Sequence, residues 1–199
     1  MPSDGQMKRL CVFCGTNPGT RPDYGAAARE LGRILAQQNI ELVYGGASVG
    51  IMGELADSVH EHGGHVTGII PQQLVEKEAA HTGIADLIVV ASMHQRKSQM
   101  ADMSDGFIAL PGGIGTLEGL FEILTWAQLG IHAKPSGILN VAGYFDGLTG
   151  FLDHAVREGF LTKEHRDAVI VEKDAVALLK RMHAYTPPGG EKLMGRTHR

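Results

Sequence analysis

A glycine-rich turn with an acid directly behind it is the part of this sequence best suited to do chemistry. Residues 110–118 read Leu-Pro-Gly-Gly-Ile-Gly-Thr-Leu-Glu, and they join an apolar run, residues 107–110, to an amphipathic stretch, residues 117–129. Clustered glycines let the backbone approach a phosphate closely, and the free N–H groups at the start of a helix point at the anion. Because like charges repel, Glu118 fits this site best if its carboxylate faces the sugar next to the phosphate. The motif therefore indicates chemistry on a nucleotide.

Glu118 also has a simpler interpretation. A glutamate in the first turn of a helix is often a surface acid that the helix dipole favours. The apolar residues of this segment repeat at helical spacing and predict its buried stripe: Leu117, Leu120, Phe121 and Leu124. Glu118 and Glu122 lie one turn apart on a neighbouring face.

A second candidate constellation is the stretch Met93–Lys97, which follows an apolar run, residues 87–90. Two adjacent cations at a helix N-terminus oppose the helix dipole, so this locally unfavourable choice indicates a function. Arg96 offers a planar fork for a phosphate or carboxylate, and Lys97 offers a point charge. The alternative interpretation is a solvated basic face.

Other cofactor signatures are weak or absent. The turns at residues 13–19 and 44–53 do not fit G-x-G-x-x-G, no acid closes the second strand as a dinucleotide ribose requires, and no Walker-type loop occurs. Ligand contact and tight strand-to-helix packing are both open for the first turn. The adjacent Gly45 and Gly46 favour close approach of a ligand or a neighbouring backbone. Lys97 as a Schiff-base lysine is a poor interpretation, because a chain of this length lacks room for the usual pyridoxal phosphate architecture.

The histidines and cysteines do not favour a metal or a disulfide. His60 and His62 are two residues apart and point to different faces of a helix, and few carboxylates near them or His65 have ligand spacing. Cys11 and Cys14 lie three apart in one predicted strand, so their side chains face opposite sides. No second ligand pair for zinc is present. We expect structural cysteines and no metal.

The elements that must position these residues alternate along the chain. Short apolar runs predict strands at residues 10–14, 41–44, 65–70, 87–90, 107–110, 137–141 and 169–171. Amphipathic stretches predict helices at residues 24–38, 50–61, 94–104, 117–129, 145–158 and 174–183. Apolar strands that alternate with helices imply a parallel sheet covered on both faces. We expect a doubly wound, Rossmann-like α/β fold, with its ligand beyond the carboxyl ends of the strands.

Length and composition set the frame for this fold. The 199 residues fit a single domain, residues 1–185, with an aperiodic and mobile tail at 186–199. A net charge of −4 gives no indication of binding to nucleic acid or to a membrane surface. No segment approaches the ~18 consecutive apolar residues of a spanning helix, and the first residues lack a signal-peptide pattern. We expect a cytoplasmic protein.

Residues Pro111–Glu118 and Met93–Lys97 together resemble the paired signature of the Lonely-guy family. These are cytokinin riboside 5'-monophosphate phosphoribohydrolases, long mislabelled as lysine decarboxylases because of a P-G-G-x-G-T-x-x-E motif. The resemblance runs from about residue 10 to residue 183 and includes residues 13–15, 44–46 and 125–130. The chain departs from the pattern at Gly119, where many members carry a second acid after the first.

The resemblance implies hydrolysis of the N-glycosidic bond of N6-substituted adenosine 5'-monophosphates, releasing the free base and ribose 5-phosphate without a cofactor. By motif, it implies that Arg96 and Glu118 are the catalytic pair. It also implies that Gly112, Gly113, Gly115 and Thr116 form the phosphate cradle and that Glu78 contacts the substrate. From their positions in the sequence, we expect the other substrate-binding residues to be Lys97, Gly45, Gly46, Ile114 and Leu117.

Glycosidic cleavage passes through an oxocarbenium-like ribosyl cation. We expect Glu118 to stabilise that charge, and Arg96 to hold phosphate or sugar oxygens and keep Glu118 ionised. Trp126 and Ile131, taken as exposed apolar residues, predict a homodimer that completes each pocket. Two alternatives stay open: a general AMP or nucleotide nucleosidase in salvage, and a nonenzymatic nucleotide-binding protein. The second is disfavoured because a binder has no need of an acid beside a phosphate.

Overall fold

The computed structural model describes residues 7–75, 77, 79–84 and 86–188, and in this part of the chain seven strands form one sheet. The strands are β1 (Arg9–Phe13), β2 (Glu41–Tyr44), β3 (Val66–Pro71), β4 (Asp86–Val90), β5 (Gly106–Ala109), β6 (Ser136–Leu139) and β7 (Val169–Glu172). Each strand coincides with an apolar run that the sequence assigned to a strand, and no end differs by more than two residues.

The helices follow the strands as the sequence predicted. They are α1 (Pro22–Gln37), α2 (Gly50–Glu61), α3 (Met93–Met103), α4 (Ile114–Gln128), α5 (Asp146–Arg157), α6 (Lys163–Asp167) and α7 (Ala175–His183), with short 3-10 turns η1 (Gln72–Leu74) and η2 (Val141–Gly143). The short helix α6 was not predicted, because five residues are too few to show a helical period. Its start is nevertheless capped by the Thr162 hydroxyl, which accepts from the backbone N–H of His165.

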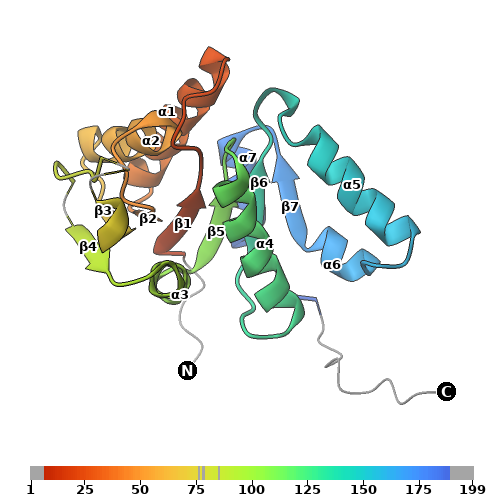
Figure 1. Ribbon diagram of the computed structural model, residues 1–199. Coiled ribbons are helices and arrows are strands. Elements are labelled where there is room, and N and C mark those ends of the chain that lie inside the picture. The colour runs from red at the N-terminus through yellow and green to blue at the C-terminus, as the bar shows by residue number, and fades with distance from the viewer. Residues whose placement is uncertain (1–6, 76, 78, 85, 189–199) are drawn as a thin grey trace.

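The order of the strands makes this a doubly wound sheet. Across the sheet the order is β4-β3-β2-β1-β5-β6-β7, and all neighbours pair in parallel. The chain therefore builds outward from β1 to β4, then crosses back to lay β5 on the other side of β1 (Figure 1). β1 is central, with Leu10 in register with Leu42 of β2 and with Gly106 of β5. The Rossmann-like fold is confirmed.

Alternation along β1 explains why both faces of the sheet are covered. Leu10 and Val12 pack into a cluster that includes residues of α1, α2 and α7. Cys11 points to the opposite face and joins a second cluster with residues of α3 and α4. A third cluster lies under α4 and the start of α5. Because side chains alternate along a strand, an apolar run of this kind needs helices on both sides to bury it.

The apolar residues around α4 differ in exposure. Trp126, expected to be exposed, is partly buried and packs against the cluster under α3 and α4. Ile131 is 64% exposed and Ile114 is 84% exposed.

Within the described residues, no helix combines the length and the apolar character that crossing a membrane requires. The tail expected at 186–199 falls outside the described residues from residue 189 onward.

His132 fixes the connection between α4 and β6 in its neutral form. The ring Nδ1 accepts from the backbone N–H of Lys134 at 3.1 Å, and Nε2 donates to the Ile123 carbonyl at 3.0 Å. The ring lies 5.3 Å from the Phe107 ring, centroid to centroid. Burial lowers the pKa of His132 below its ordinary value, and the nearby Lys134 charge acts in the same direction.

This lowered pKa predicts a loss of stability in acid. Since the unfolded chain binds a proton at His132 more readily than the folded protein, the contribution of this residue is complete above about pH 6.5 and is lost as the pH falls below that value. We expect His132→Gln to flatten the decline of Tm between pH 7 and pH 5, measured by differential scanning calorimetry. His154→Gln, which removes an exposed imidazole, serves as the control. Parallel Tm profiles for wild type and His132→Gln would contradict this account.

Candidate active site

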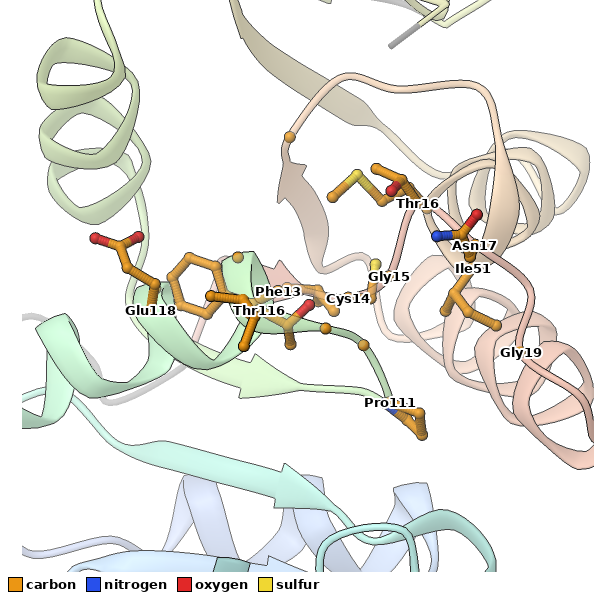
Figure 2. A pocket seen from close by; sticks show the side chains of 18 of the residues that line it. Phe13, Cys14, Gly15, Thr16, Asn17, Gly19, Ile51, Pro111, Thr116 and Glu118 are labelled. Carbon is orange, nitrogen blue, oxygen red and sulfur yellow. The ribbon is translucent and has the colours of Figure 1, made fainter.

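The signature residues meet where the strand order reverses. β1 lies between β2 and β5, so the segments that follow β1 and β5 leave the sheet side by side at its carboxyl edge. Open α/β sheets bind ligands at this point. A cavity of about 580 Å³ opens here, and it is lined by the turn after β1, the start of α4 and one side of α3. Figure 2 shows Phe13 and Glu118 toward one side of this pocket and Thr16 and Asn17 toward the other.

The start of α4 provides an anion site made of backbone. The helix begins at Ile114, three residues before the predicted start, with Gly113 as an N-cap that has no side-chain cap. The first backbone N–H of α4 that makes a helical hydrogen bond is that of Leu117, which donates to the Gly113 carbonyl at 3.2 Å. The N–H groups of residues 114–116 therefore have no acceptor within the helix. Free N–H groups and the positive end of the helix dipole together favour a phosphate here.

Two glycine turns touch behind this anion site. The Gly15 N–H donates to the Pro111 carbonyl at 3.1 Å. A Cβ added to Gly15 would lie 3.2 Å from the Gly112 Cα, and one added to Gly112 would overlap the Thr116 hydroxyl. A side chain at Gly112 would therefore force the two turns apart, and one at Gly15 would make a tight contact with the second turn. The first turn therefore packs against the turn before α4 and also lines the pocket. Tight packing is confirmed for Gly15, and ligand contact stays a prediction.

Arg96 is anchored at the carboxyl ends of β2 and β3. The residue is 7% exposed, its Nε donates to the Ile69 carbonyl at 2.9 Å, and its Nη2 donates to the Gly45 carbonyl at 2.6 Å. α3 carries this side chain to the pocket. Ser92 caps the start of the helix, where its hydroxyl accepts a hydrogen bond from the backbone N–H of Gln95 at 3.2 Å. Arg96 is therefore a fixed positive charge in the pocket wall, which excludes the solvated basic face for this residue.

The cation in contact with Glu118 is Lys97. Lys97 Nζ donates to Glu118 Oε1 at 2.5 Å and to Glu122 Oε1 at 3.1 Å. The hydrogen bond to Glu118 is the largest cause that raises the pKa of Lys97 above its ordinary value. Lys97 thus stays charged and ties α3 to the second and third turns of α4. The ammonium of Lys97 lies beside the Glu118 carboxylate, whereas the contacts of the Arg96 guanidinium include the backbone carbonyls of Gly45 and Ile69. The influence of Arg96 on Glu118 stays a prediction.

The position after Glu118 has a steric reason to be glycine. A Cβ added to Gly119 would lie 2.8 Å from Cδ1 of Phe13, a residue of β1 that lines the pocket. A side chain at 119 would therefore require the Phe13 ring to move. Counted from Pro111, the acid that ends the motif P-G-G-x-G-T-x-x-E falls at residue 119, so Glu118 stands one position before it. Of the carboxylates on α4, Glu118 is the one that lines the pocket.

The structure brings most of the expected site residues together. The lining of the pocket includes Arg96, Lys97, Gly45, Gly112, Gly113, Ile114, Gly115, Thr116 and Glu118. Leu117 and Gly46 are not among its lining residues. Leu117 packs against the cluster under α4 and α5, and Gly46, with φ +80°, packs against Ile70 and Leu87. Glu78 lies outside the described residues.

Sequence reasoning missed two aromatic residues that line the pocket, Tyr24 and Tyr144. Tyr24 lies in the first turn of α1, and Tyr144 follows β6, the neighbour of β5. Their rings meet edge to face with centroids 5.5 Å apart. A position just beyond the carboxyl end of a strand was the available signal for Tyr144, but it required the order of the strands.

The two cysteines are buried and free, and they pack on opposite faces of the sheet as their spacing predicted. Burial raises the pKa of the Cys14 thiol to about 12, so it stays protonated at neutral pH although Cys14 borders the pocket. In the described part of the chain, no three His, Cys, Asp or Glu side chains are grouped so that they could hold a metal ion.

The chain is similar to known proteins over most of its length. Residues 52–182 match the family model described as "Possible lysine decarboxylase". The chain is 49% identical over 182 residues to cytokinin riboside 5'-monophosphate phosphoribohydrolase LOG3 of Arabidopsis thaliana, covering 92% of this chain and 85% of that protein. It is also 49% identical over 182 residues to the probable enzyme of the same name, LOGL9, of Oryza sativa subsp. japonica, covering 92% and 80%.

One solved structure with the same fold is the Moco carrier protein from Chlamydomonas reinhardtii. It superposes with a TM-score of 0.67 at 22% identity, covering 90% of this chain and 99% of that one. At this identity the likeness concerns the fold alone.

The anchoring of Arg96 predicts that Gly45 cannot be enlarged. A Cβ at Gly45 would overlap Arg96 Nη2, so we expect Gly45→Ala to displace the guanidinium and destabilise the protein by about 1–3 kcal/mol. Chemical denaturation measures this free energy of unfolding. In the control Gly150→Ala, on α5, the added methyl meets no atom within 4 Å. We expect that control to stabilise the protein by roughly 0.5–1 kcal/mol. Wild-type stability in Gly45→Ala would refute the tight contact.

Proposed function

The chain belongs to the Lonely-guy family of cytokinin riboside 5'-monophosphate phosphoribohydrolases, and we propose that it hydrolyses the N-glycosidic bond of adenosine 5'-monophosphates, N6-substituted ones in particular. The products are the free base and ribose 5-phosphate. The observation that carries this proposal is the anion site at the start of α4, with the Glu118 carboxylate one turn further along the same helix.

The spacing along α4 suits a nucleotide. Glu118 lies four positions after Ile114, which is about 6 Å along the helix axis. A 5'-phosphate bound to the N–H groups of residues 114–116 would therefore place its ribose beside Glu118. The pocket continues past Lys97 to Met93 and Met100, which offer an apolar wall for a base.

In the proposed reaction, Glu118 supports the positive charge that develops on the ribose. The bond between C1' and the base nitrogen breaks, and its electron pair leaves with the base. A water oxygen bonds to C1', and one proton of that water ends, in the net balance, on the base nitrogen. A carboxylate beside C1' stabilises the ribosyl cation and can orient or deprotonate the water. Lys97 holds this carboxylate in place through the ion pair at 2.5 Å.

We assign Arg96 to the phosphate or sugar oxygens of the substrate. Its guanidinium is already fixed by the carbonyls of Gly45 and Ile69, so little conformational entropy is lost when it meets an anion. A preorganised charge of this kind stabilises the transition state more than a flexible one, because it does not reorganise during the reaction.

Decarboxylation of lysine, the activity in the description of the family model, fits the pocket less well. A lysine substrate carries two ammonium groups and one carboxylate, whereas the prominent feature of this pocket is a helix N-terminus that favours anions. A phosphorylated substrate uses that feature fully. The site therefore supports chemistry on a nucleotide over chemistry on lysine.

Replacing the carboxylate of Glu118 should remove most of the activity. We expect Glu118→Gln to lower kcat by on the order of 10²–10⁴-fold with AMP and with isopentenyladenosine 5'-monophosphate, because an amide carries no charge to stabilise the ribosyl cation. Chromatography of the released base measures the rate. The ratio of the two wild-type rates separates cytokinin activation from general nucleotide salvage.

The control for this experiment is Glu61→Gln, which makes the same chemical change at the exposed end of α2 and should keep the wild-type rate. Unchanged release of base from Glu118→Gln would remove this carboxylate from the mechanism. Binding of both nucleotides by wild type without any release of base would favour the nonenzymatic nucleotide-binding protein.

We also propose that two copies of the chain form a homodimer through the α4 side. Ile114, at the mouth of the pocket, is 84% exposed, and Leu129 and Ile131, beyond the other end of α4, are 60% and 64% exposed. Exposed apolar residues at both ends of one helix suit an interface between proteins. A partner seated there would also narrow the opening of the pocket.

The cytoplasmic location expected from the sequence stays a prediction.

Sedimentation velocity at micromolar concentration should show a dimer for the wild-type chain. Ile131→Lys should shift it toward monomer, because the interface would have to bury an unpaired charge. Phe160→Lys, at an exposed apolar residue between α5 and α6, should leave the dimer intact. A wild-type protein that sediments only as a monomer would show that this proposal is wrong.

A further inference from the structure

The hydroxyl of Tyr144 donates a hydrogen bond to the Gly112 carbonyl, with an O···O distance of 2.6 Å. Gly112 lies in the turn that leads to the anion site, whereas Tyr144 comes from the connection after β6. We propose that Tyr144 is a positioning residue for phosphate binding, which acts by fixing the orientation of the peptide between Gly112 and Gly113. This inference rests on the proposed function, because it names the residue that shapes the phosphate site of that reaction.

The peptide between two glycines needs such a restraint. Without a Cβ on either side, a glycine–glycine peptide rotates between orientations at little steric cost. The C=O and N–H of a trans peptide point in opposite directions, so a flip exchanges an acceptor for a donor. A carbonyl turned toward the anion site would place a partial negative charge next to the phosphate. The hydroxyl of Tyr144 holds the Gly112 carbonyl in one orientation and thereby disfavours the flipped one.

Tyr144 is itself held by neighbouring rings. The Tyr24 ring meets it edge to face at 5.5 Å, and the Phe145 ring at 4.9 Å with an interplanar angle of 90°. Phe145 is 1% exposed, so this second contact belongs to the protein core. Tyr144 is 43% exposed, and these two contacts keep its ring directed at the glycine turn although one side faces the pocket.

The backbone before Tyr144 is also fixed. Asn140 is 4% exposed, its Oδ1 accepts from the Phe145 N–H at 2.7 Å, and its Nδ2 donates to Asp146 Oδ1 at 2.7 Å. Between them Ala142 adopts φ +52°, a conformation that an alanine reaches only at a cost. Strained residues of this kind persist where the surroundings over-determine them and are common at functional sites. The turn after β6 therefore delivers the hydroxyl to the Gly112 carbonyl.

The test compares Tyr144→Phe, which deletes only the hydroxyl, with Tyr185→Phe, which deletes a hydroxyl from a partly buried tyrosine near the C-terminal end of α7. Isothermal titration calorimetry with ribose 5-phosphate gives Kd for each variant, and base release from AMP gives kcat and KM. We expect Tyr144→Phe to raise the Kd for ribose 5-phosphate and the KM for AMP by on the order of 3–10-fold, the loss of one hydrogen bond, with kcat within about twofold of wild type. Tyr185→Phe should match wild type in all three.

A merely structural role for the Tyr144 hydroxyl would lower Tm without changing the Kd for ribose 5-phosphate, and that result would overturn the proposal. An equal rise of Kd in Tyr185→Phe, or a fall in kcat with Kd unchanged, would overturn it as well. If wild type releases no base from AMP, the proposed reaction fails, but the Kd comparison still decides whether Tyr144 shapes a phosphate site. If wild type does not bind ribose 5-phosphate, the proposal is wrong.

Discussion

The close contact of two glycine turns, one after β1 and one after β5, is the constraint on which the rest of the site depends. Gly15 donates to the Pro111 carbonyl, a Cβ at Gly112 would lie 2.7 Å from the Gly15 nitrogen, and one at Gly15 would lie 3.2 Å from the Gly112 Cα. This contact exists because the sheet reverses its order between β1 and β5, which brings the two turns to one edge. The N-terminus of α4 is thereby set against the turn after β1, and the pocket forms between them.

Two charged residues of α3 fix this helix against the sheet and against α4. Arg96 binds the carbonyls at the ends of β2 and β3, and Lys97 binds Glu118 and Glu122 on α4. Two cations at the start of α3 are unfavourable for an isolated helix. Their contacts with carbonyls and carboxylates offset that cost. The same contacts hold the two positive charges in fixed positions at the pocket. The unfavourable placement of two cations at the start of a helix thus correctly indicated residues that line the pocket.

The sequence predicted the strands and six of the seven described α helices, because hydrophobic period and glycine placement are local signals. It predicted that the glycine-rich turn and the basic pair share one site, because the carboxyl ends of parallel strands meet at one edge. It misplaced details that depend on packing. Gly46 lies against Ile70 and Leu87, and Leu117 packs against the cluster under α4 and α5. Trp126 packs against the core, and Lys97 forms an ion pair with Glu118.

The sequence by itself determined the doubly wound fold, the glycine-rich turn that opens α4 and the presence of an acid one helical turn beyond it. Each of these follows from residues that are neighbours in the chain. The tertiary structure alone decided which groups face that acid and that turn. Lys97 reaches Glu118 from another helix, and Tyr144 reaches Gly112 from a connection 32 residues away. Contacts of this kind are set by strand order and by the packing of side chains, which a one-dimensional pattern does not contain.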